Sequence, residues 1–133
     1  MYEILMPIDS SEARGKKQAE TVAELPGAAE ELQVTLMYVF DDEDREETTS
    51  PNQIRGGKAA ETRLEEAGVV VREESRVGDP ATEILAVADE LDVDHLVLGG
   101  RKRSPLGSLL FGSVTQAVVL DSERPVTITG GEK

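Results

Sequence analysis

The chain has 133 residues with a formal net charge of −13, no cysteine and one histidine. Its length suits a single domain spanning residues 1–133, and the lack of cysteine excludes disulfides, thiolate metal sites and cysteine nucleophiles. The acidic surface disfavours nucleic acid and anionic membranes as general partners, and because molar salt screens such repulsion it also fits a salt-loving source.

The first third of the chain predicts two strands separated by a helix. Apolar runs at 2–8 and 34–40 are nearly continuous, which is typical of strands buried on both faces of a parallel sheet. Ser10 or Ser11 can cap the helix between them. The stretch 41–50 (DDEDREETTS) has no apolar residue and strong like charge, so it is expected to be a mobile loop.

The middle of the chain continues the alternation. A helix ending at Gly68 leads into a strand at 69–77, whose charged second half indicates an edge strand. Asp79-Pro80 supplies an N-cap and a first-turn proline for the next helix, and the buried run 95–98 follows. His95 lies within that apolar run, where a structural role is expected.

The last part of the chain completes five strands. Ser113 and Gln116 form a capping-box pair at the head of a final helix, and 126–129 is the fifth strand. This βαβαβαβαβ order predicts an α/β fold with an open five-stranded parallel sheet and helices on both faces. Tyr2 already belongs to a strand and no apolar run is long enough to span a membrane, so a soluble cytoplasmic protein is expected.

A ligand in such a sheet binds beyond the carboxyl ends of its strands. There, Gly99 ends the fourth strand, a basic run occupies 101–103 (RKR), and Gly112-Ser113 opens a helix whose N-terminus favours an anion. Each feature alone is also explained as a turn, as solvated surface or as a helix cap. Together, at one predicted edge of the sheet, they favour an anion site.

At these residues the chain resembles the universal stress protein family, whose nucleotide-binding members carry G-x-x-G, nine residues, then G-[S/T]. Gly99 matches the first glycine and Gly112-Ser113 the last pair, whereas Lys102 occupies the place of the second glycine. The resemblance covers nearly the whole chain and includes the segments ILMPIDSSE, MYVFD, VGDPATEIL, RSPLGSLLFGSV and RPVTIT.

The resemblance implies a Rossmann-like fold of the adenine nucleotide alpha hydrolase kind, with strand order 3-2-1-4-5 and two helices on each face. It also implies ATP at the carboxyl ends of strands one and four, with Asp9 and Val39 on the adenosine side and the phosphates against the glycines. The residues expected to bind the nucleotide are Pro7, Ile8, Asp9, Val39, Leu98, Gly99, Lys102, Gly112, Ser113 and Val114.

Two of these residues have alternative roles. The Lys102 ammonium can hold the phosphates as a point charge, or the side chain can fold across the pocket and close it. Asp9 can coordinate Mg²⁺ through the nucleotide, or can serve only as a cap or turn residue at the start of the first helix.

The leading hypothesis is a nucleotide-binding regulatory protein in which ATP occupancy sets the state seen by a protein partner of unknown identity. Hydrolysis should be slow or absent, because no assembled set of base and charge-stabilising groups is evident. The alternative is a dimeric interaction or scaffold domain that binds no nucleotide. An ATP-consuming adenylyl-transfer enzyme ranks last, because the first loop lacks an SGGxDS-like sequence.

A homodimer through the last strand, Val126 to Thr129, is also expected. Its apolar residues alternate with threonines, and no inward-pointing charge protects the edge. Two such edges can pair about a twofold axis and satisfy each other's backbone groups, and the family resemblance implies the same arrangement.

Overall fold

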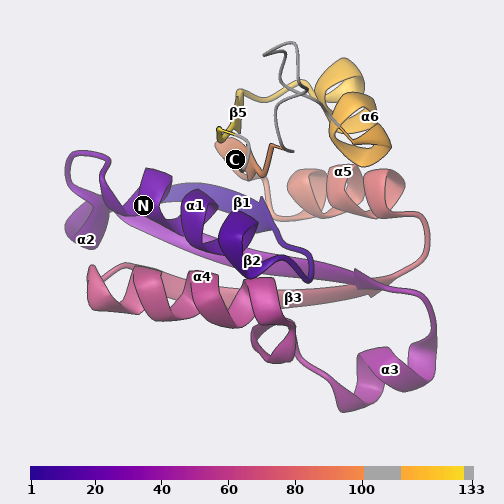
Figure 1. Cartoon of the computed structure of the whole chain (residues 1–133). Coiled ribbons are helices and arrows are strands. Elements are labelled where there is room, and N and C mark those ends of the chain that lie inside the picture. Colours follow the sequence, from indigo (N-terminus) through magenta and orange to yellow (C-terminus); the bar gives the residue numbers. More distant parts are fainter. Residues whose placement is uncertain (101–111, 131–133) are drawn as a thin grey trace, which may run out of the picture.

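The computed structural model describes residues 1–100 and 112–130. Its strands form one parallel sheet in the order β3-β2-β1-β4-β5, which confirms the predicted order (Figure 1). The strands are β1 (Tyr2–Pro7), β2 (Leu32–Phe40), β3 (Val70–Val77), β4 (His95–Leu98) and β5 (Val126–Ile128). The partly charged β3 lies at one edge, as its sequence indicates.

Two long helices cover each face of the sheet, as predicted. On one face lie α1 (Glu12–Ala23) and α4 (Arg55–Glu66), side by side, with the short α2 (Ala28–Glu31) (Figure 1). On the other face lie α5 (Pro80–Glu90) and α6 (Ser113–Asp121). A short helix, α3 (Glu43–Thr48), and a 3-10 turn, η1 (Pro51–Gln53), connect β2 to α4. Within the described ranges, no helix combines the length and the apolar character that a membrane span requires.

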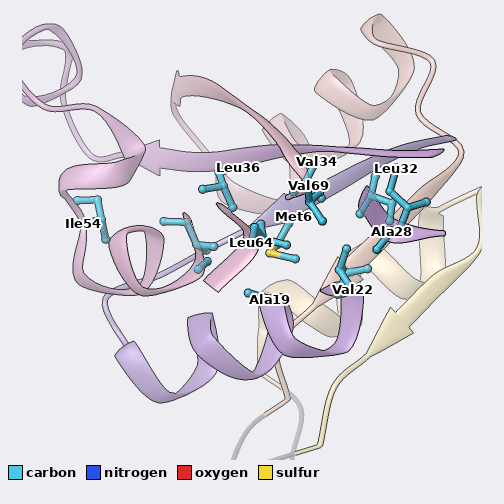
Figure 2. Packing of buried hydrophobic residues seen from close by; sticks show 14 of the residues in the cluster. Met6, Ala19, Val22, Ala28, Leu32, Val34, Leu36, Ile54, Leu64 and Val69 are labelled. Atoms are coloured by element: carbon cyan, nitrogen blue, oxygen red, sulfur yellow. The ribbon is translucent and has the colours of Figure 1, made fainter. Parts of the chain in front are cut away.

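The core has two parts, one on each face, because side chains alternate across each strand. Ile4 and Met6 of β1 pack under α1 and α4, whereas Leu5 between them packs toward α5 and α6. Figure 2 shows the first part, in which Ala19 and Val22 of α1 lie over the strands. All three β1 side chains have no exposed surface, so the continuous apolar run of β1 reflects burial on both faces.

The acidic stretch 41–50 is not wholly a loop, and that prediction was wrong over α3. The Asp42 side chain accepts a hydrogen bond from the Arg45 backbone N–H at 2.8 Å and caps the helix. Three acidic residues in the first turn lie at the positive end of the helix dipole, and the Arg45 guanidinium lies 5.8 Å from the centre of the Phe40 ring. A helix this short and exposed needs no apolar stripe, so hydrophobic periodicity could not reveal it.

The N-termini of α5 and α6 differ in how they are capped. Asp79 caps α5: its carboxylate accepts from the Thr82 hydroxyl at 2.7 Å and from the Thr82 backbone N–H at 3.0 Å, and these two bonds lower the pKa of the carboxyl. The capping box predicted at Ser113 was wrong. Gly112 has the extended backbone of an N-cap and Ser113 is already the first helical residue, so the N-cap residue itself supplies no side-chain cap to α6.

His95 joins three strands, in agreement with a structural role. Its Nδ1 lies 3.0 Å from the Tyr2 hydroxyl of β1, and its Nε2 lies 2.7 Å from the Thr127 hydroxyl of β5. Burial lowers the pKa of the imidazole, because the neutral ring is easier to desolvate. Both ring nitrogens therefore have partners within the sheet, away from the carboxyl ends of the strands.

Helices α1 and α4 approach each other through glycines. A Cβ atom placed on Gly15 of α1 would lie 2.1 Å from the Gly56 carbonyl oxygen of α4. A Cβ on Gly56 would in turn lie 2.1 Å from the Asp9 carbonyl oxygen. The backbone of α4 thus contacts both α1 and the turn between β1 and α1, and there is no space for a side chain at either position.

We expect Gly15→Ala to destabilise the protein by roughly 1–3 kcal/mol, because the added methyl must displace backbone rather than a flexible side chain. Alanine favours a helix over glycine by about 1 kcal/mol, and this gain offsets part of the cost of the steric clash. Urea unfolding checks this prediction, with Lys16→Ala on the exposed side of α1 and Gly130→Ala as controls. Among the described residues, a Cβ at Gly130 would meet only Lys17 Cε, at 3.9 Å. A Gly15→Ala variant as stable as the parent would show that the helix contact can relax.

Candidate functional site

The strand order reverses direction at β1, which pairs with β2 on one side and with β4 on the other. The helices that connect the strands on one side of β1 cover one face of the sheet, and those on its other side cover the opposite face. A crevice therefore opens beyond the carboxyl ends of these strands. A cavity of about 360 Å³ lies there, bounded by the ends of β1, β2 and β4 and by the start of α6. Its volume falls within the range of small-molecule sites.

Nine of the ten residues predicted to bind the ligand line this one cavity. They come from four segments of the chain: Pro7, Ile8, Asp9, Val39, Leu98, Gly99, Gly112, Ser113 and Val114. The tenth, Lys102, lies outside the described residues. The structure also brings residues to the cavity that the sequence did not indicate, among them Arg14, Gln18, Tyr38 and Asp41.

One part of the cavity is apolar. Ile8, just after β1, and Leu98, at the end of β4, are 7% and 4% exposed. The half-buried Val39 lies near the end of β2, on the other side of β1 from β4. Such a slot between strand ends suits a flat, largely apolar group such as a purine ring.

Another part of the cavity is the N-terminus of α6. Gly112 makes no side-chain cap bond, and the first N–H groups of a helix have no acceptor within the helix itself. Ser113, Val114 and Thr115 of this first turn line the cavity. Their N–H groups and the positive end of the helix dipole favour an anion at this point.

Asp9 is held on both carboxylate oxygens. Its Oδ1 accepts from the Ser11 backbone N–H at 2.8 Å, and its Oδ2 accepts from Arg14 Nε at 2.9 Å. The carboxylate therefore stabilises the turn into α1 while it lines the cavity. Over the described ranges, no cluster of three acidic, histidine or cysteine ligands that could hold a metal ion is found.

Gln18 is a site residue that sequence reasoning missed. Its side chain is 2% exposed, and its Nε2 donates to the Pro7 carbonyl at 2.8 Å and to the Val97 carbonyl at 3.1 Å. One amide thus joins β1 and β4 where their own pairing has ended, since the register stops at Leu5–Leu96. The available signal was a polar residue beside Ala19, on the side of α1 that was expected to face the core.

Gly99 has a packing role in this arrangement. A Cβ there would lie 3.3 Å from Arg14 Cδ and 3.3 Å from Gln18 Oε1. Gly99 does not have a positive φ, so its backbone torsion does not require glycine. The close packing of Arg14 and Gln18 favours a residue without a Cβ here.

Comparisons with known proteins agree with one another. The model of the universal stress protein family matches residues 1–130. A universal stress protein of Mycolicibacterium smegmatis is 42% identical over 67 residues, which cover 50% of this chain. The chain spans between 40% and 52% of the length of the first two curated relatives that it matches.

Solved structures match over more of the chain. A universal stress protein from Archaeoglobus fulgidus superposes with a TM-score of 0.76 at 27% identity, over 97% of this chain and 98% of that one. Another structure of a universal stress protein from the same organism, in complex with dAMP, has a TM-score of 0.71 at 22% identity over 97% and 98%. At that identity, the second similarity concerns the fold alone.

The bridge made by Gln18 predicts a measurable loss of stability. Gln18→Met keeps a similar volume but removes both N–H donors, which leaves the part-buried Pro7 carbonyl and the buried Val97 carbonyl without this partner. We expect a loss of roughly 1–3 kcal/mol in urea unfolding. Gln116→Met, at an exposed position of α6, is the matched control. Equal stability of Gln18→Met and the parent would mean that other donors replace the amide.

Proposed function

The chain belongs to the universal stress protein family, and we propose that it is a nucleotide-binding regulatory protein that binds ATP at the carboxyl ends of β1 and β4. The observation that carries this proposal is the convergence of nine predicted residues, from four separate segments, on one cavity. That cavity combines an apolar slot with the N-terminus of α6, whose N-cap residue is a glycine.

The two parts of the cavity suit the two parts of a nucleotide. The adenine ring would lie between Val39 and Leu98, with Asp9 near the adenosine, and the phosphates would lie against Gly99 and the first turn of α6. The Archaeoglobus fulgidus protein solved in complex with dAMP, an adenine nucleotide, shares this fold. Mg²⁺ would arrive with the nucleotide and neutralise part of its charge.

The geometry favours binding over hydrolysis. A general base for water needs a carboxylate that can accept a proton. Both oxygens of Asp9 already accept hydrogen bonds, one of them from a guanidinium, so this carboxylate already serves the turn into α1. We therefore propose that turnover is slow or absent, and that the bound nucleotide acts by changing the surface that a partner protein contacts.

Calorimetry with Mg-ATP tests the proposal. Gly112→Val should abolish binding, because a branched side chain would occupy the space that a phosphate needs at the start of α6. Gly130→Val, outside the cavity lining, is the control. Mass spectrometry of gently purified protein adds an independent measurement, since co-purified nucleotide would support the proposal. No heat with Mg-ATP and no co-purified nucleotide would leave the interaction or scaffold domain as the function.

Lys102→Ala in the same experiment separates the two roles of that residue. If the ammonium holds a phosphate, the substitution should weaken binding by roughly 1–3 kcal/mol, as expected for a lost charged hydrogen bond. If the side chain closes the pocket, the same substitution should strengthen binding.

We also propose that two copies of the chain pair through β5. In the described part of the sheet β5 pairs only with β4, so its other side is an open edge. Beside this edge, Val119, Leu120 and Ile128 line a mostly apolar hollow, and Leu120 is 82% exposed. An open edge next to exposed apolar side chains favours a partner that covers both.

Sedimentation of Val126→Pro tests the dimer. The Thr129 N–H donates to the Leu98 carbonyl of β4, so by alternation the Val126 N–H faces the open edge. Proline removes that N–H without removing a bond to β4, and should shift the protein to monomer. Leu120→Glu, which charges the hollow, should act in the same direction. A parent protein that is monomeric at micromolar concentration, or a Val126→Pro protein that stays fully dimeric, would contradict the proposal.

A further inference from the structure

Arg14 is the one cationic side chain among the described residues that line the cavity. It belongs to the first turn of α1, far in sequence from the glycines at which phosphates are expected. Its side chain is 23% exposed, so most of it is withdrawn from bulk water. A guanidinium in such a place interacts with an anion more strongly than one on the open surface.

The side chain of Arg14 reaches from one strand end to the other. Its Nε donates to Asp9 Oδ2 at 2.9 Å, beyond β1, and its Cδ lies 3.3 Å from the position that a Cβ of Gly99 would take, beyond β4. A Cβ on residue 99 would require Arg14 Cδ to shift by a few tenths of an ångström, so the glycine leaves room for the arginine at this point. Asp9 fixes the direction of the guanidinium by the ion pair.

The charge balance of the cavity gives Arg14 a specific importance. Asp9 and Asp41 also line the cavity, so an arriving phosphate meets two carboxylates in the described lining. Arg14 offsets one of these charges and offers the planar N–H fork that matches a phosphate. A guanidinium has five N–H donors, which is enough to serve a carboxylate and a phosphate together.

We propose that Arg14 is a phosphate-binding residue of this site, and that Asp9 holds its guanidinium in position for the phosphate. This inference rests on the proposed nucleotide binding and adds to it the group that recognises the anionic part of the ligand. It assigns a role to a helix residue outside the glycine pattern by which the family resemblance was recognised.

Calorimetry with three ligands, ATP, AMP and adenosine, separates recognition of phosphate from recognition of the nucleoside. Arg14→Gln should weaken ATP and AMP roughly 10- to 100-fold, as expected for a lost charged hydrogen bond, and should change adenosine by less than about twofold. Arg14→Lys, which keeps the charge but loses the fork, should recover part of the ATP affinity. Lys16→Gln makes the same change of charge two residues away, on a side chain that is 66% exposed, and should leave all three ligands unchanged.

The outcomes distinguish this inference from the proposal on which it rests. If the parent protein binds none of the three ligands, nucleotide binding itself fails. If the parent binds them and Arg14→Gln weakens adenosine as much as ATP, Arg14 only supports the shape of the pocket, and the inference is wrong. If Arg14→Gln leaves ATP unchanged, or if Lys16→Gln weakens ATP equally, no specific contact with phosphate exists.

Discussion

One side-chain amide, that of Gln18, joins β1 and β4 at the crevice. Where β1 and β4 stop pairing, the Pro7 and Val97 carbonyls face a region that the sheet no longer spans, and Gln18 Nε2 donates to both. Buried carbonyls without donors are costly, so an opening between two strands needs such a partner. The same helix that supplies Gln18 also places Arg14 at the mouth of the crevice.

The position of α1 depends in turn on glycines, which have no side chain to keep neighbouring groups apart. Gly15 and Gly56 let α4 contact α1 directly, and Gly99 leaves room for Arg14 and Gln18 above the end of β4. Two polar residues of the site, Arg14 and Gln18, therefore come from a closely packed helix and not from a loop. In a chain of net charge −13, the proposed anion site would depend on Arg14 and on the N-terminus of α6, because the surface as a whole opposes an anion.

Much of this architecture could be predicted from the sequence because its signals are local. Burial on both faces makes β1 and β2 continuous apolar runs, and a charged second half marks β3 as an edge. The N-cap at Asp79 follows from one residue and its neighbours, and the glycines of 99–113 point to the strand ends where the cavity lies. The sequence patterns failed at two places. The short exposed helix α3 has no apolar stripe that would reveal it, and the N-cap of α6 is Gly112 instead of Ser113.

The sequence by itself determined the strands, the long helices and the edge of the sheet at which a ligand would bind. Only the tertiary structure showed that Gln18 and Arg14 also reach that edge. Gln18 and Arg14 lie on a helix whose polar and apolar positions look ordinary along the chain, and their partners at Val97 and Gly99 are about 80 residues away. Hydrogen bonds and close contacts over such a separation depend on how α1 packs over the sheet, and no periodicity or capping signal within one segment carries that information.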